Sequence, residues 1–306
     1  MSRRIIVGSR GSRLALIQAE SLVAKIREVN PRPEISLREI STSGDRDHRT
    51  QLDQMGPSVF VKELEEALLD NRIDMAVHSL KDVPTDIPQG LCLLAVTERL
   101  DPRDVLISSN GRLDELPPAS RIGTGSLRRA VQLRSYRPDL KVCSIKGNVD
   151  TRLRKVSHGE FDGVILAAAA MLRLGWQERI TEYLSLETFL PAVGQGALVV
   201  EARLNDEDIA RLVSPINNLP IWQCVTAERA LLRTLGGGCR APVAALGMVN
   251  GNTLKLEGMV ASVTSLKMLH TSEEGTAISA EEIGVRLAEK MIGMGASEFI
   301  AEARAK

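Results

Sequence analysis

A thiol at the end of a glycine run is the feature of this 306-residue chain with the most chemical content. The run Leu235-Gly236-Gly237-Gly238 leads directly into Cys239. Glycine has no Cβ, so such a loop reaches backbone angles that other residues resist and can bring the sulfur close to a bound molecule. Cys239 is therefore a candidate nucleophile or covalent attachment point. The alternative is a glycine helix cap followed by a small buried residue.

Basic and hydroxyl side chains follow several predicted strands. Ligands of open α/β sheets bind at the carboxyl ends of the strands, so we expect these side chains to line one anion-binding cleft. Taken alone, each arginine also fits an ordinary solvated loop charge. The residues in these loops are Ser9, Arg10, Ser12, Ser79, Lys81, Asp82, Thr124, Ser126, Arg128, Arg129, Lys146 and Asn148.

The segment Gly123-Thr124-Gly125-Ser126-Leu127-Arg128-Arg129 leads from a short predicted strand into a helix. Unpaired amides and the helix dipole at such a helix start favour an anion. The segment lacks the final Gly-Lys-Ser/Thr of a Walker loop and the third glycine of a dinucleotide fingerprint. Its two arginines would add paired donors suited to carboxylates.

Asp82 is the acidic exception among these basic loops. A lone carboxylate amid cations stays ionised, and it can stabilise a developing positive charge or transfer a proton. The alternatives are a salt bridge to Lys81 or a turn-forming role before Val83-Pro84.

Overall composition excludes several classes of protein. The chain has 39 basic and 39 acidic residues, is 43% hydrophobic, and is typical of a globular protein of two or three domains. Ten Lys or Arg and two acids lie between Ser120 and Lys155, but aromatic residues are only 3% of the chain, which argues against single-stranded nucleic acid. With no signal-peptide core, no long apolar span and widely spaced cysteines, we expect a cytoplasmic protein without a metal site or disulfide framework.

Hydrophobic patterning predicts an α/β fold of parallel sheets with helices on both faces. The clearest helix follows Val61, with Leu64 and Leu68 on one face and Glu63, Glu65 and Glu66 on a solvated side. The expected strands are Arg4 to Gly8, Glu34 to Ser41, Asp74 to His78, Leu91 to Val96, Val105 to Ile107, Lys141 to Ile145 and Gly163 to Ala168.

Nine ordered motifs, spread over nearly the whole chain, resemble the porphobilinogen deaminase (hydroxymethylbilane synthase) family. They are Arg10 to Ala15 with Gln18, Phe60 to Glu65, His78 to Pro84, Asp101 to Asp104, Gly123 to Arg129, Gly147 to Leu153, Leu190 to Ala197, Ala227 to Arg229 and Gly237 to Cys239.

The resemblance implies a transferase of tetrapyrrole (haem) biosynthesis. Such an enzyme condenses four porphobilinogen molecules head to tail, releases ammonia, and yields hydroxymethylbilane (preuroporphyrinogen). The implied primer is a dipyrromethane cofactor joined through a thioether to Cys239. The implied partners are porphobilinogen and the growing polypyrrole chain, with no metal, nucleic acid or membrane, and the enzyme is expected to be a monomer.

The resemblance also assigns roles to individual residues. Asp82 matches the essential carboxylate near the pyrrole nitrogens, where a fixed anion lowers the barrier to the cationic azafulvene formed as ammonia leaves. Phe60 matches a lid position. The implied cofactor contacts are Cys239, Lys81, Asp82, Ser126, Arg128 and Arg129, and the implied substrate contacts are Arg10, Ser12, Lys146, Arg152, Arg173 and Gln195.

The implied architecture is two doubly wound lobes like those of periplasmic binding proteins and a smaller α+β C-terminal domain that carries Cys239. The expected boundaries are 1–98 with 197–215, 99–196, and 216–306. The polar stretch Gly44 to Ser58 fits a mobile flap better than a disordered loop or a metal site.

Two departures from the family pattern affect the cleft. Pro57-Ser58 stands where many relatives have Lys-Gly, and Lys146 replaces a common arginine and supplies only a point charge. An anion-binding or solute-binding module would share the lobes and the basic cleft without needing a Cys239 adduct. A nucleic-acid-binding protein would instead show affinity that falls steeply with salt.

Overall fold

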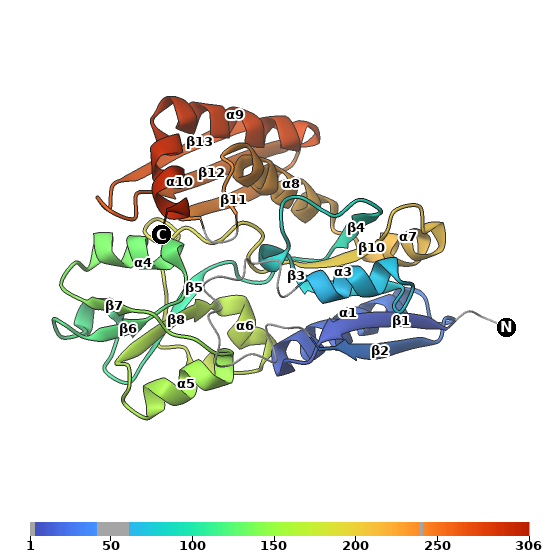
Figure 1. Ribbon diagram of the computed structural model, residues 1–306, viewed down its shortest axis with the longest axis horizontal. Coiled ribbons are helices and arrows are strands. Elements are labelled where there is room, and N and C mark those ends of the chain that lie inside the picture. Colours follow the sequence, from blue (N-terminus) through green and yellow to red (C-terminus); the bar gives the residue numbers. More distant parts are fainter. Residues whose placement is uncertain (1–3, 42–60, 239–240, 306) are drawn as a thin grey trace. The chain divides into compact units, whose positions relative to one another are not determined.

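The structure is a computed structural model that describes residues 4–41, 61–238 and 241–305. The chain divides into two compact units (Figure 1). They comprise Met1–Arg99 with Ala197–Trp222, and Leu100–Gly196 with Gln223–Lys306. Within the described ranges, no helix is both long enough and apolar enough to cross a membrane.

The first unit is built on a five-stranded mixed sheet in the order β2-β1-β3-β10-β4. Strand β1 is parallel to β2 and β3, whereas β10 is antiparallel to β3 and β4. The strands are β1 (Ile5–Arg10), β2 (Ile35–Ile40), β3 (Met75–Ser79), β4 (Leu91–Val96) and β10 (Leu198–Arg203).

Helices cover both faces of this first sheet. Successive residues of a strand point to opposite faces, so each strand contributes side chains to both helix layers. Val7 and Val77 pack with α1 (Arg13–Val29) and α7 (Glu207–Val213) on one face. Ala76 packs with α3 (Lys62–Leu69) on the other face. The short 3-10 turns of this unit are η2 (Leu80–Asp82) and η5 (Ser214–Ile216).

A second five-stranded sheet in the other unit repeats this topology, in the order β7-β6-β8-β5-β9. Here β6 is parallel to β7 and β8, and β5 is antiparallel to β8 and β9. The strands are β5 (Asp104–Ser108), β6 (Arg121–Gly123), β7 (Lys141–Cys143), β8 (Gly163–Ala167) and β9 (Glu182–Tyr183). The helices and turns are η3 (Leu113–Glu115), α4 (Leu127–Tyr136), α5 (Val149–Ser157), α6 (Ala168–Arg173) and η4 (Gln177–Arg179).

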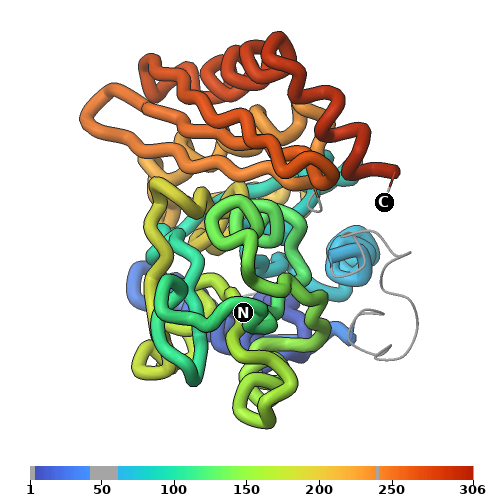
Figure 2. The backbone as a smooth tube through the Cα atoms, turned by 90° about the vertical axis from the view of Figure 1, so that its left-hand side faces the viewer, coloured from blue at the N-terminus to red at the C-terminus, as the bar shows by residue number. Residues whose placement is uncertain are grey.

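The same unit contains a three-stranded antiparallel sheet in the order β11-β12-β13. One face packs against three helices, and Figure 2 shows the red helix α9 lying over the orange strands. The other face packs with Val131 of α4 and with Leu190. The elements are α8 (Leu219–Thr234), β11 (Val243–Asn250), β12 (Thr253–Ala261), β13 (Met268–Thr276), η6 (Ala277–Ser279), α9 (Ala280–Gly293) and α10 (Ala296–Arg304).

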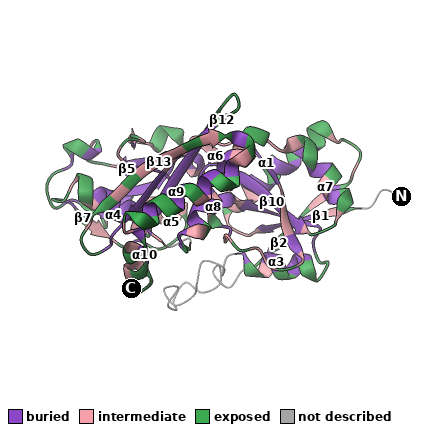
Figure 3. Cartoon of the chain, turned by 90° about the horizontal axis from the view of Figure 1, so that it is seen from above, coloured by how far each residue is buried: buried purple, intermediate pink, exposed green. Residues whose placement is uncertain are grey.

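The predicted α/β class is confirmed, and every predicted strand is present with its ends shifted by a few residues. The expectation of purely parallel sheets is wrong, because β5 and β10 run antiparallel to their neighbours. The helix after Val61 is also confirmed as α3, but Glu65 is buried rather than solvated. Figure 3 shows strands β5 and β10 as mostly buried.

Candidate active site

Two loops of the first unit lie at the carboxyl ends of neighbouring parallel strands, β1 and β3. Arg10 is the last residue of β1 and is half-buried. Ser12 caps α1, because its Oγ accepts a hydrogen bond from the Ala15 amide at 3.3 Å. Between them, Gly11 approaches Glu39 so closely that a Cβ would lie 1.9 Å from Glu39 Oε1.

The second of these loops carries Asp82 at the end of the turn η2. Its base is held from two sides: Gln18 Nε2 donates to Ser79 Oγ at 2.9 Å, and the Leu80 amide donates to the Ala197 carbonyl at 3.1 Å. The Asp82 side chain is exposed and makes neither a hydrogen bond nor an ion pair with any other described residue. Within that part of the chain, the alternative of a salt bridge to Lys81 is therefore not realised.

In the second unit, the segment Gly123 to Arg129 forms the start of α4 as predicted. Ser126 is the N-cap residue, and its Oγ lies 3.5 Å from the Arg129 amide. Thr124 Oγ1 accepts a bond from the Ser126 amide at 3.2 Å and so fixes the preceding turn. The loop passes close to Ile145, whose carbonyl oxygen would lie 3.2 Å from a Cβ on Gly125.

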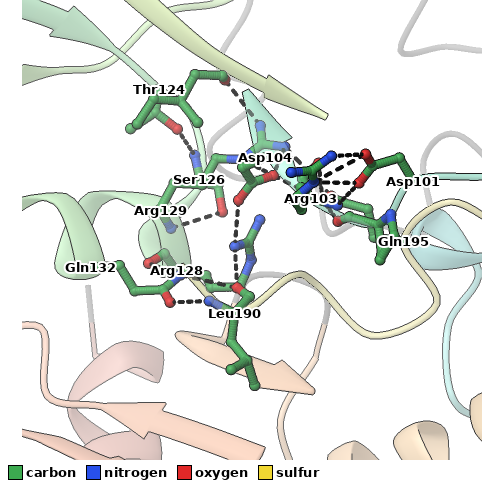
Figure 4. A network of polar contacts seen from close by, with 12 residues as sticks. Asp101, Arg103, Asp104, Thr124, Ser126, Arg128, Arg129, Gln132, Leu190 and Gln195 are labelled. Carbon is green, nitrogen blue, oxygen red and sulfur yellow. Dashed lines mark hydrogen bonds and ion pairs between the residues drawn. The ribbon is translucent and has the colours of Figure 1, made fainter. Parts of the chain in front are cut away.

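Both arginines of this segment reach inward to one buried carboxylate, Asp104 at the start of β5 (Figure 4). Arg128 Nη1 lies 2.7 Å from Asp104 Oδ2 and also donates to the Leu190 carbonyl at 2.7 Å. Arg129 binds Asp104 Oδ1 through Nε at 3.0 Å and Nη2 at 2.7 Å. Gln195 completes the network by donating from Nε2 to Asp104 Oδ1 at 2.8 Å.

The charges in this network do not cancel. Burial alone would raise the pKa of Asp104, but Arg128 and Arg129 hold it well below its usual range. Burial lowers the pKa of Arg128, and the Asp104 charge partly offsets that effect. One carboxylate therefore balances only one of two buried guanidinium groups.

Two further arginines of this unit add to the positive charge. Burial, together with Arg129, lowers the pKa of Arg152 to about 10, and burial lowers the pKa of Arg173 to about 10. Each donates to a backbone carbonyl, Arg152 to Gly147 at 2.8 Å and Arg173 to Gly196 at 2.7 Å. Neither has a carboxylate partner among the described residues. Lys146 is exposed in the loop after β7.

The glycine run before Cys239 ends helix α8. Gly236 has φ +65°, and the Gly237 amide donates to the Leu232 carbonyl at 3.0 Å. The helix-cap interpretation of these glycines is therefore confirmed. Cys239 and the lid residue Phe60 lie outside the described residues, as do Pro57-Ser58 and the stretch Gly44 to Ser58.

Comparison with known proteins decides the family. Residues 5–211 match the model "Porphobilinogen deaminase, dipyromethane cofactor binding domain", and residues 222–293 match "Porphobilinogen deaminase, C-terminal domain". Porphobilinogen deaminase of Desulforudis audaxviator is 47% identical, with 100% of this chain and 99% of the relative covered. That of Syntrophus aciditrophicus is 45% identical, covering 94% and 95%. The chain belongs to the porphobilinogen deaminase family.

Among the solved structures that match the chain is the probable amino-acid ABC transporter extracellular-binding protein ytmK from Bacillus subtilis. It is 10% identical, with a TM-score of 0.43, and the match covers 71% of this chain and 90% of that one. The lobes of this chain are themselves defined by two mixed sheets with the same pattern of parallel and antiparallel neighbours.

The structure brings together Ser126, Arg128, Arg129 and Gln195 in one network. Sequence reasoning missed Asp104 as their anchor, although the motif Asp101 to Asp104 was noted. The available signal was an acidic residue, Asp104, at the first position of a strand whose next three residues are apolar and buried.

Proposed function

We propose that this chain is a porphobilinogen deaminase. It condenses four porphobilinogen molecules head to tail into hydroxymethylbilane and releases ammonia at each addition. It does so on a dipyrromethane primer linked to Cys239. Family membership supports the reaction, and the site supports the substrate class.

The observation that carries the proposal is the surplus of guanidinium groups in the second unit. Arg128 and Arg129 share a single described carboxylate, Asp104, and Arg152 lies close enough to Arg129 for their positive charges to oppose each other. Buried cations without counter-charges are costly, so a bound anion would stabilise them. Dipyrromethane and porphobilinogen carry acetate and propionate groups, and this donor set suits such a ligand.

The bound dipyrromethane would supply the pyrrole to which the first unit is joined, and each later unit would be joined to the free end of the growing chain. Ser126, Arg128 and Arg129, with Lys81, would hold its carboxylates, and Arg10, Ser12, Lys146, Arg152, Arg173 and Gln195 would hold those of the substrate. Paired guanidinium donors fix both the position and the orientation of a carboxylate.

Asp82 would act on the reacting end of the chain. Its carboxylate is exposed and has no partner among the described residues, so it is available to a ligand. A fixed anion there stabilises the positive charge that develops as ammonia leaves, and Asp82 would also transfer the proton to the leaving amine. Phe60 would serve as a lid residue.

We also propose three domains, 1–98 with 197–215, 99–196 and 216–306, the last of which presents Cys239. The first sheet takes β10 from beyond the segment that forms the second sheet, which supports division of the first 215 residues into two lobes. The enzyme would work as a cytoplasmic monomer. Light scattering of the purified protein tests the monomer.

The intact mass of the freshly purified protein tests the central claim. We expect a mass increase of two linked pyrrole units, and its absence in Cys239→Ser. The matched control is Cys143→Ser, because Cys143 is a half-buried thiol of the same unit and should leave the adduct in place.

Activity on porphobilinogen separates the alternatives. An adduct with porphobilinogen consumption establishes the primed reaction. Full activity without any adduct would contradict the role of Cys239. Tight binding of carboxylate ligands with no consumption, even after incubation with porphobilinogen, would favour a solute-binding module.

A further inference from the structure

Three ionisable side chains are buried together in the first unit. Glu65 on α3, His78 on β3 and Glu201 on β10 are 8%, 6% and 0% exposed. His78 Nε2 lies 3.0 Å from Glu201 Oε2. Glu65 is close enough to interact electrostatically with both other groups. The cluster is separate from the network around Asp104, which belongs to the other unit.

The cluster is short of positive charge. Glu201 Oε1 is buried without a hydrogen-bond partner among the described residues. Two ionised carboxylates would share one imidazole, and an uncompensated buried charge is strongly unfavourable. Burial, then the Glu201 charge, raises the pKa of Glu65 to about 7, while His78 lowers it. A proton on Glu65 therefore relieves the imbalance near neutral pH.

The charged groups around the cluster do not remove this shortage. On β10, Arg203 is engaged by Asp74 at 3.4 Å and Asp206 at 3.0 Å. On α3, Glu66 adds a further negative charge that raises the pKa of Glu65. On β4, burial and Glu201 raise the pKa of Cys92, which keeps that thiol neutral.

Strand β1 ends in a cation, Arg10, which is not among the charges that shift the pKa of Glu65. Val7 pairs with Met75 and Gly8 with Ala76 in the parallel register between β1 and β3. Arg10 is the last residue of β1 and one of the proposed substrate contacts. The strand that carries His78 thus leads into one loop of the candidate site in this unit and pairs with the strand that leads into the other.

Near the Asp82 turn, β10 and the residue before it contact β3 and the following residue through one backbone and one side-chain interaction. The Ala197 carbonyl, directly before β10, accepts a hydrogen bond from the Leu80 amide at 3.1 Å. Glu201 of β10 contacts the His78 side chain. His78 precedes Asp82 by four residues, and the turn between them is short. A shift of the His78 ring would therefore move the base of the turn that presents Asp82.

We propose that Glu201 and His78 are positioning residues for Asp82, and that Glu65 holds the proton that allows their buried pair to persist. The link to Asp82 rests on the proposed function. The cluster itself does not, because its protonation can be measured without substrate.

The first test is the pH titration of the His78 ring nitrogens by NMR. The chain has four histidines, and His78→Gln assigns the signal. We expect these signals to report the protonation of Glu65 as a step near pH 7 in the wild type, and that step to be lost in Glu65→Gln. Glu66→Gln is the matched control on the exposed side of α3; it removes only the smallest of the charges that raise the pKa of Glu65 and should keep the step. An unchanged midpoint in Glu65→Gln would overturn the proposal.

The second test is the steady-state kinetics of Glu201→Gln with porphobilinogen. We expect kcat to fall about tenfold or more with little change in KM, because misplacing Asp82 affects the chemical step more than substrate binding. Glu66→Gln should retain wild-type kcat. Wild-type kcat in Glu201→Gln would overturn the positioning role. If this variant does not fold, or the wild type does not consume porphobilinogen, the His78 titration decides.

Discussion

At the scale of single residues, Asp104 fixes the electrostatics of the second unit. It is fully buried and binds two guanidinium groups, so its loss leaves like charges facing each other. We expect Asp104→Asn to lower the free energy of unfolding by about 3–5 kcal/mol, as when one partner of a buried ion pair is removed. Chemical denaturation measures this. Asp139→Asn, which breaks the more exposed pair with Arg137, should cost far less; equal losses would contradict the ranking.

Replacing Arg152 should lower activity without lowering stability, in contrast to replacing Asp104. Its half-buried charge has no described carboxylate partner, so Arg152→Gln relieves a desolvation cost. We expect its unfolding free energy to match or exceed that of the wild type. Activity on porphobilinogen should fall about tenfold, from a lost charged hydrogen bond of about 1.5 kcal/mol. Arg154→Gln, at an exposed position of the same helix, is the control; a similar loss of activity there would refute the assignment.

The role of Asp82 in catalysis can likewise be separated from its contribution to stability. Because its side chain is exposed, Asp82→Asn should change stability by no more than about 0.5 kcal/mol. Its kcat should fall on the order of 100-fold or more, since both the anion and the proton donor are lost. Asp86→Asn, an exposed acid in the following loop, should leave kcat unchanged. Equal rates for wild type and Asp82→Asn would exclude the catalytic role.

At the scale of elements, the first glycine of the run, Gly236, has a structural role at the end of helix α8. Gly236 has φ +65°, and a Cβ there would lie 2.8 Å from Arg304 Nη2. We expect Gly236→Ala to cost about 1–2 kcal/mol, the penalty of a left-handed conformation for a residue with a side chain. A Cβ on Gly238 would meet nothing within 4 Å, so Gly238→Ala should cost less in the same thermal or chemical unfolding measurement. The reverse order would show that the cap is unimportant.

The elements themselves were largely predictable from the sequence, because apolar periodicity reports local structure. Strand direction was not, since β10 joins β3 from more than a hundred residues away and no local pattern records its direction. Glu65 was misassigned for a related reason. Helical periodicity places it beside solvated acids, and only the tertiary contact with β3 and β10 shows that it is buried.

At the scale of the whole molecule, the family resemblance located the site residues, but physical patterns alone did not show their partners. Arg128 and Arg129 suggested anion binding from sequence, yet their anchor Asp104 lies 24 or 25 residues away. Such pairings depend on how β5 and α4 pack, which no spacing rule contains. The basic character of the second unit was predictable from the sequence. The excess of buried guanidinium groups over carboxylates is visible only in the structure.

The pH dependence of global stability follows from Glu65. Its pKa rises from 4.5 to about 7 on folding, so between these values the folded state holds a proton that the unfolded state has released. Stability therefore falls as pH rises through this window, by about 3 kcal/mol in total for this group. Glu65→Gln cannot ionise, so its unfolding free energy relative to wild type should increase by about that amount between pH 4 and pH 8. Denaturation curves across this range test it, with Glu66→Gln as the control; a constant difference between Glu65→Gln and wild type would show that Glu65 titrates normally.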